Sequence, residues 1–185
     1  MLRRFTTKEI ILIAVLAAFM FIIDFFIVAP INTITGVHGM GFLIDVIFIN
    51  AIVTIFALIT RKFFSVTILY TLFGLLVIPT SIMGPPTPFK IILGFIIGIT
   101  ADLIIWISKY KTIGFVFGVA VANALSYPIG LLFAILLGLP GVEALRDAIL
   151  FLTIGVLLLG ILGDIFGVWI FKKIKNKQIV KQLQS

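Results

Sequence analysis

Long apolar runs alternate with short polar breaks along the whole chain. The runs are continuous, most of them have 16 to 25 residues, and none alternates polar and apolar positions as a half-exposed strand would. About 20 apolar residues form one helix that spans a bilayer. We therefore predict six membrane-spanning helices, at residues 10–28, 42–59, 63–78, 89–107, 113–137 and 146–171.

The composition points to the same fold class. The 185 residues are 62% hydrophobic and only 11% charged, with a mean hydropathy of +1.35. A soluble domain has about 25% charged residues, so a soluble enzyme is excluded. We predict an all-α integral membrane protein, a six-helix bundle that forms one transmembrane domain over residues 1–185. The first run exceeds the roughly 7–15-residue core of a signal peptide, so we expect it to be retained.

The basic residues predict how the bundle is oriented. Twelve of the 14 Lys and Arg residues lie at alternate ends of the predicted helices, and the other two are Lys90 and Arg146. Because cytoplasmic loops carry the excess of Lys and Arg, both chain ends are expected in the cytoplasm. The net charge of +7 then reflects topology and lipid headgroups, and we expect no nucleic-acid partner.

Polar side chains within the apolar runs mark candidate functional residues, because burying them in a bilayer is costly. Most of them fall in the half of the bundle predicted to face outside. Each also has a structural interpretation, such as a Lys side chain that reaches the headgroups or an Asn that joins two helices. The residues are Asp24, Asp45, Asn50, Lys90, Asn123, Ser126, Tyr127, Glu143, Arg146 and Asp147.

Three further features complete the inventory of polar and small residues. His38 in the predicted first loop, residues 30–41, is either a wet surface residue or a ligand contact. The chain has no second His and no Cys to support a metal site. Asp102 and Asp164 form a separate pair in the inner half. Small residues at four-residue spacing, such as Gly94 and Gly98, mark close helix contacts.

Motifs for catalysis and for nucleotide binding are absent from the sequence. It contains no Gly-x-Ser-x-Gly, no His-Glu-x-x-His and no Walker A motif. We therefore predict that the protein is not an enzyme and holds no cofactor. Any ATP that drives its function would be bound by another chain.

Three segments carry a resemblance to a known family. The first span contains Ala14-Val15-Leu16-Ala17-Ala18, and the fourth follows a Pro-rich loop and begins Pro88-Phe89-Lys90. The sixth ends with Gly160-Ile161-Leu162-Gly163-Asp164 before a lysine-rich tail. In these features, and in size and topology, the chain resembles the S components of energy-coupling factor (ECF) transporters. These are the membrane subunits that capture vitamins.

The resemblance implies partners and sites. In the family, small residues on the first span contact a transmembrane coupling subunit, which works with two ATPase subunits. The matching positions are Ala14, Ala17 and Ala18. The family's substrate site lies near the outer face, which implies capture of a vitamin, a vitamin precursor or a similar trace nutrient at a prokaryotic cell membrane. The candidate substrate-binding residues are His38, Asp45, Lys90, Asn123, Tyr127 and Arg146.

The sequence is compatible with more than one class of ligand and more than one function. Lys90 and Arg146 would suit an anionic ligand, whereas Asp24 and Asp45 would suit an amine. The main alternative function is a stand-alone, ion-coupled secondary transporter or channel for a small solute. A structural subunit of a larger membrane complex is a third possibility.

Overall fold

The structure is a computed structural model that describes residues 5–36, 40–80, 82–83, 86–138, 142–177 and 180. Throughout these residues, the regular secondary structure is helical. The helices are α1 (Thr7–Thr35), α2 (Met40–Thr60), α3 (Ser65–Leu76), α4 (Phe89–Ile107), α5 (Thr112–Leu136) and α6 (Val142–Ile174). All but α3 are long and apolar enough to cross a membrane, and α3 is a shorter apolar helix. The prediction of an all-helical membrane protein is confirmed.

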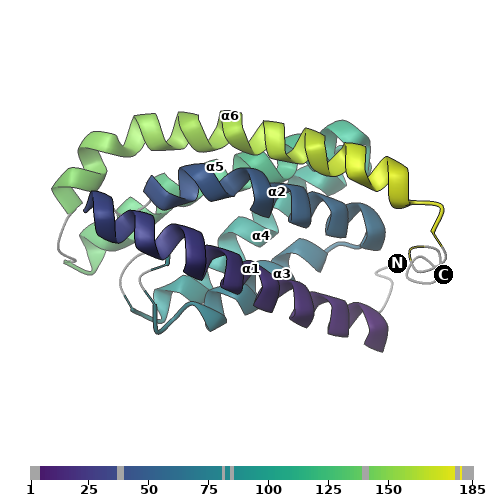
Figure 1. Cartoon of the computed structure of the whole chain (residues 1–185), viewed down its shortest axis with the longest axis horizontal. Helices are drawn as coiled ribbons and strands as arrows, with labels where there is room; N and C mark the ends of the chain where they lie inside the picture. The colour runs from purple at the N-terminus through teal and green to yellow at the C-terminus, as the bar shows by residue number, and fades with distance from the viewer. Residues whose placement is uncertain are drawn as a thin grey trace.

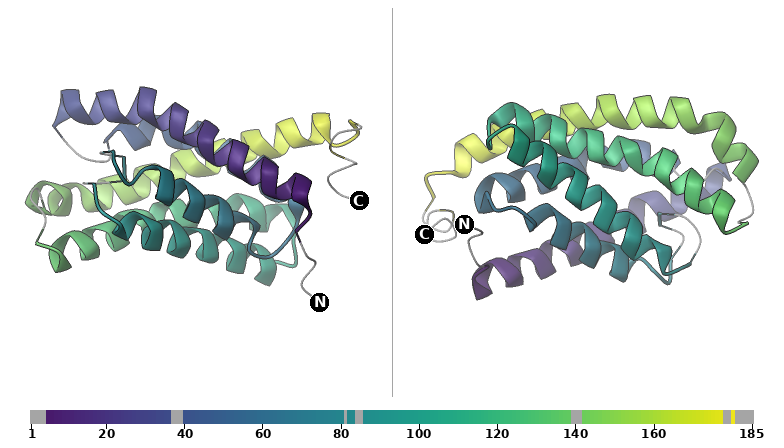
Figure 2. Two further views of the ribbon diagram at one scale, coloured as in Figure 1. Left: turned by 90° about the horizontal axis from the view of Figure 1, so that it is seen from below. Right: turned by 180° about the vertical axis from the view of Figure 1, so that it is seen from behind.

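The helices run side by side and alternate in direction (Figures 1 and 2). α1 begins and α6 ends at the same end of the bundle, which we call the terminal end. The α2–α3 and α4–α5 connections also lie there, and the opposite end is called the far end. The terminal end therefore carries the basic residues of both connections and of the last turn of α6, whereas Lys90 and Arg146 lie toward the far end.

α1 and α6 extend four or more residues further at the far end than the apolar pattern predicts. α1 continues through Pro30 to Thr35, whereas the sequence pattern placed a loop from residue 30 onward. Proline removes one main-chain donor, but the turn persists, and the helix ends where Gly36 adopts φ +68° and its N–H bonds to the Asn32 carbonyl. α6 begins at Val142, four residues before the predicted start.

Glycines allow neighbouring helices to approach until their backbones touch. A Cβ added at Gly94 or Gly98 of α4 would overlap main-chain atoms of Tyr70 or Thr67 in α3. Gly163 of α6 meets the Ile47 backbone of α2 in the same way. The prediction that these small residues mark close helix contacts is confirmed, and the contacts bring polar side chains of different helices within bonding distance.

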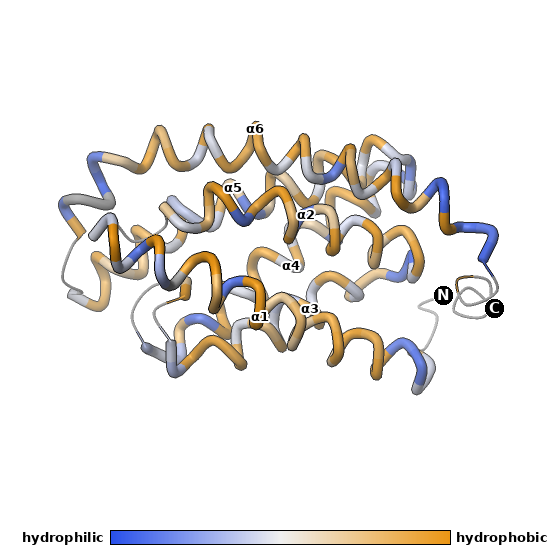
Figure 3. Tube along the Cα trace, viewed as in Figure 1, coloured by the Kyte–Doolittle hydropathy of each residue, from blue (hydrophilic) through white to orange (hydrophobic). Residues whose placement is uncertain are grey.

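The outside of the bundle is apolar. Large hydrophobic side chains are exposed along α1 and α6, among them Val15, Phe19, Leu158 and Leu162. The hydropathy colouring shows mostly apolar residues along the middle of the helices and hydrophilic ones near both ends of the bundle (Figure 3). Such a surface suits contact with lipid rather than water.

Candidate functional site

A close contact between α1 and α2 positions the main candidate site. A Cβ at Gly41 would lie 2.6 Å from the Val28 backbone, so only glycine lets the two helices meet here. Asp24 lies four residues before Val28, and Asp45 lies four residues after Gly41. Because residues four apart share one face of a helix, the contact places both aspartates one turn deeper in the bundle, facing each other.

We call these two residues the aspartate pair. Asp24 and Asp45 are 1% and 0% exposed, and their side chains lie within hydrogen-bonding range of each other. A carboxylate oxygen can only accept, so two carboxyls bond each other only when one of them holds a proton. Among the described residues, no donor reaches Asp24 Oδ1 or either side-chain oxygen of Asp45.

This arrangement is energetically costly. A buried carboxylate without donors loses its hydration and gains nothing in return, and two adjacent carboxylates repel. The pair therefore has to share a proton or hold a cationic group. Polar groups of this kind inside a membrane protein mark a functional site by default.

A second set of buried polar side chains lies next to the pair and joins four helices. Asn123 Nδ2 of α5 donates to Asn50 Oδ1 of α2 at 2.6 Å and to the Tyr70 hydroxyl of α3 at 2.7 Å. Asp164 of α6 accepts from Asn50 Nδ2 at 3.1 Å and from Thr54 Oγ1 at 2.6 Å. We call these five residues the amide network. Its carboxylate has donors, in contrast to the aspartate pair.

Tyr70 connects the two sets of residues. Its hydroxyl accepts from Asn123, and the tyrosine lies within electrostatic reach of Asp24, Asp45 and Asp164. The pair and the network thus form one polar region in an otherwise apolar bundle. Gly160 makes room for it, because a Cβ there would lie 2.7 Å from Asn50 Nδ2.

The short helix α3 is held at both ends by charged side chains of α4. At its start, Asp102 accepts from the Thr67 N–H at 2.8 Å, from the Thr67 hydroxyl at 2.7 Å and from the Val66 N–H at 3.4 Å. Beyond its end, Lys90 Nζ donates to the carbonyls of Val77 at 3.0 Å and Thr80 at 2.6 Å. Each charge has the sign that the helix dipole favours.

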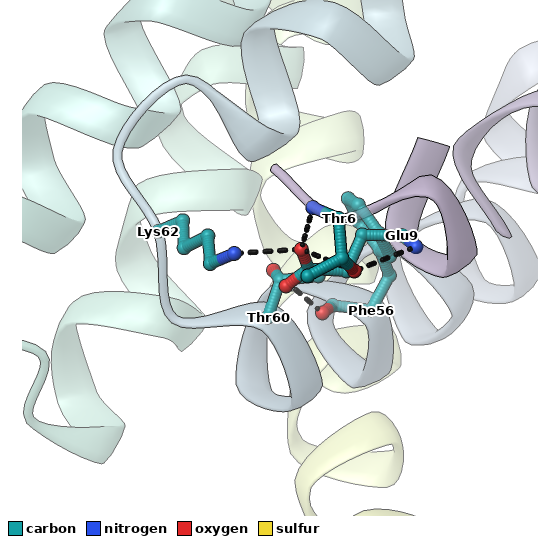
Figure 4. Close-up of polar contacts among 5 residues, drawn as sticks. All are labelled: Thr6, Glu9, Phe56, Thr60 and Lys62. Atoms are coloured by element: carbon teal, nitrogen blue, oxygen red, sulfur yellow. Dashed lines mark hydrogen bonds and ion pairs between the residues drawn. The ribbon is translucent and has the colours of Figure 1, made fainter. Parts of the chain in front are cut away.

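The terminal end contains a buried ion pair. Lys62, in the α2–α3 connection, places Nζ 2.6 Å from Glu9 Oε2, and both side chains are almost fully buried. Thr6 also donates to this carboxylate through its N–H at 2.7 Å, and its hydroxyl accepts from the Glu9 N–H (Figure 4). The ion pair fastens the start of α1 to the connection between α2 and α3.

The structure distributes the five predicted substrate-binding residues that it describes over several sites. Asp45 belongs to the aspartate pair, and Asn123 belongs to the amide network. The Lys90 ammonium group donates to the Val77 and Thr80 carbonyls beyond the end of α3. Arg146 is exposed near the start of α6. Tyr127 is buried on α5, with its ring centroid 6.3 Å from that of Phe42. His38 lies outside the described residues.

The structure also places other residues that the sequence analysis grouped together. Asp102 and Asp164 have separate partners, because Asp102 binds the start of α3 whereas Asp164 binds α2. Ala14 and Ala18 are exposed on α1, whereas Ala17 is fully buried in the core of the bundle. The reason is the helical repeat, which turns position 17 away from the face shared by positions 14 and 18.

Sequence reasoning missed Tyr70 and Thr54 altogether, and it named Asp24 only as a group that would suit an amine, outside the six predicted substrate-binding residues. A signal for Thr54 was present, because it lies four residues after Asn50 and therefore on the same face of α2. Tyr70 is an isolated phenol within an apolar run, and nothing in its sequence neighbourhood indicates which helix it faces.

The fold and the hydropathy define a helical, multi-pass membrane protein. No protein-family model, no curated protein and no solved structure matches the chain.

Proposed function

We propose that the protein is the substrate-capture membrane subunit, or S component, of an ECF importer in a prokaryotic cell membrane. In this proposal all six helices cross the membrane, and α3 does so with the help of its flanking turns. The terminal end faces the cytoplasm, because it carries most of the basic residues. The far end then faces outside, and the substrate is a vitamin, a vitamin precursor or a similar trace nutrient.

One observation carries the proposal: a buried pair of carboxyls in the half of the bundle nearer the far end, with three oxygens that no donor reaches among the described residues. The other three buried acids bond to helix ends, amides or a lysine, and so have a structural explanation. The aspartate pair has none, because it weakens the fold unless something binds to it. A site for a solute captured from outside gives the pair a reason to exist.

A second feature supports the partner assignment. α1 is the least buried of the five long spans, and it exposes Ala14 and Ala18 on one face. Small residues let another helix approach closely in a membrane. The proposed occupant of this face is the transmembrane coupling subunit, which connects the chain to two ATPase subunits. They supply the ATP-binding motif that this sequence lacks.

The proposal is tested by co-expressing the tagged full chain with its host's ATPases and coupling subunit, followed by purification and uptake measurements in proteoliposomes. Ala14→Trp and Ala18→Trp should abolish co-purification and ATP-driven uptake, because a large side chain prevents close approach. Leu158→Trp, at an exposed position of α6, is the matched control and should change neither. Mass spectrometry of the released small molecules identifies the substrate. ATP-driven uptake that survives both alanine variants would overturn the interface assignment.

The aspartate pair also favours a second candidate function. Two adjacent carboxyls that share a proton can release and rebind it during transport, as a proton-coupled secondary transporter requires. In this case the purified chain alone would take up solute along a pH gradient without ATP. A protonophore would stop this uptake, whereas it would leave uptake by an ATP-driven complex intact.

A further inference from the structure

The buried charges indicate the sign of the ligand. Among the described residues the buried cations are Lys62 and Lys90, and both are occupied: Lys62 by Glu9, and Lys90 by two main-chain carbonyls. Arg146 is exposed near the far end of α6, away from the polar region. Within the described part of the chain, no buried positive charge is therefore left to bind an anion. The buried side-chain oxygens that lack a partner there belong to two acids, Asp24 and Asp45.

The geometry of the pair matches one chemical group well. Three buried oxygens, one from Asp24 and two from Asp45, lack a donor within the described residues. A primary ammonium group carries three N–H donors and one positive charge. Among these residues there is also no group of three or more His, Asp or Glu side chains that could hold a metal ion. We propose that the aspartate pair binds the ammonium group of a cationic solute.

This inference rests on the proposed function, because it names the substrate class of a transport site. Binding is an exchange: the ammonium group enters, and the proton shared by Asp24 and Asp45 leaves to solvent. No covalent bond forms or breaks apart from this proton transfer, and the net charge at the site stays the same. A neutral or anionic solute cannot replace the proton in this way.

The route to the pair leads from the far end. Directly above it, the Val28–Gly41 contact closes the space between α1 and α2, and Asn32 Oδ1 accepts from the Gly41 N–H at 3.0 Å. Pro30 cannot donate to the Phe26 carbonyl, which weakens α1 at this turn. Bending at this proline would break the Asn32–Gly41 bond and open the way to the carboxyls.

The groups around the pair predict how pH affects binding. From α3, Tyr70 lies within electrostatic reach of both aspartates and of Asp164 of α6. On α5, the titratable group of this region is the buried Tyr127. Because a proton and the ammonium compete for the same oxygens, affinity should rise with pH for as long as the amine keeps its own proton.

The test uses the full chain, purified in detergent and held at constant ionic strength in a weak buffer. Methylammonium is the probe. Tetramethylammonium controls for a cation of similar charge without N–H donors, and sodium controls for a simple monovalent cation. Methylammonium should raise the unfolding temperature of the wild-type protein and release protons that a pH indicator detects. The other two ions should do neither.

Three variants locate the site. Asp24→Asn and Asp45→Asn should lower the apparent affinity for methylammonium about tenfold or more, because each removes a charged acceptor. Asp147→Asn, which changes an exposed acid of α6, is the matched control and should behave like wild type. The unfolding transition without probe shows whether each variant is folded.

Three results would overturn the inference. They are the absence of any methylammonium effect in the wild type, an equal response to tetramethylammonium or sodium, and an unchanged response in a folded Asp45→Asn variant. ATP-driven uptake and coupling to ATPases test the proposed function separately from the ammonium site. If the Asp45→Asn variant keeps ATP-driven uptake, the ammonium site is disproved and the ECF assignment stands. If the chain responds to methylammonium but never couples to ATPases, the ammonium site stands and the ECF assignment is disproved.

Discussion

Five acidic side chains are buried in this bundle, and they fall into two groups that the protein treats differently. Glu9, Asp102 and Asp164 each accept from at least two donors, and each joins elements that are distant in sequence. Asp24 and Asp45 lie within hydrogen-bonding range of each other, and three of their four side-chain oxygens lack a donor among the described residues. The acids of the first group hold helices together, whereas those of the second weaken the fold unless they share a proton or hold a cation.

The largest effect is expected at the start of α3. Asp102→Ala leaves the buried N–H groups of Val66 and Thr67 and the Thr67 hydroxyl without their acceptor. Orphaned buried donors cost about 1–3 kcal/mol each, so we expect a loss of about 3–4 kcal/mol in the free energy of unfolding. Denaturant unfolding in detergent measures it. A loss below about 1 kcal/mol would show that Asp102 is not a structural acid.

The ion pair at the terminal end comes next. Lys62→Met leaves the Glu9 carboxylate buried without its cation, which typically costs about 3 kcal/mol. The double variant Glu9→Gln with Lys62→Met removes both charges and should recover most of this loss. A double-mutant cycle in the same unfolding assay measures the coupling. If the double variant is as unstable as the single one, the charge itself is not the cause.

A smaller loss is expected within the amide network. Asp164→Asn keeps one acceptor oxygen but replaces the other with a donor, which meets the Asn50 amide or the Thr54 hydroxyl. We expect a destabilisation of about 1–2 kcal/mol, corresponding to about one lost hydrogen bond to a charged group. Gly155, also on α6, offers a contrast, because a Cβ there meets only the end of the Leu43 side chain. Gly155→Ala should cost less than Asp164→Asn.

The smallest effect on stability should come from the aspartate pair. Asp24→Asn supplies a donor to Asp45 and removes the need for a shared proton. We therefore expect the free energy of unfolding to stay unchanged or to rise by up to about 1 kcal/mol. The same unfolding assay, run without ligand, checks this. A loss like that of Asp102→Ala would place the pair among the structural acids and remove the main argument for a binding site.

Much of the fold could be predicted from the sequence, because apolar runs of membrane length leave little choice. α4 has the bounds that its apolar run predicts, and the ends of α5 differ by one residue. The end of α1 could not be predicted, since Pro30 and the polar residues after it indicate a loop as readily as a helix. The brevity of α3 depends on the bonds that Asp102 and Lys90 make from another helix.

The site was harder to predict than the fold. Asp45 and Asn123 could be singled out because polar groups are rare in these runs. Which of them meet depends on how each helix is rotated about its axis. Helices that are apolar on all sides have no polar face that would fix this rotation. Here close contacts at glycines fix the rotation of each helix instead, as Gly41 does at Val28. The sequence does not show which residue a glycine will contact.

The brevity of α3 has a consequence for how the chain enters the membrane during synthesis. Its 12 residues span about 18 Å as a helix, well short of the roughly 30 Å of the hydrocarbon core. Both of its ends bond to charged side chains of α4, which is made later. We therefore expect α3 to wait at the insertion machinery until α4 emerges, so that the two integrate together as a hairpin.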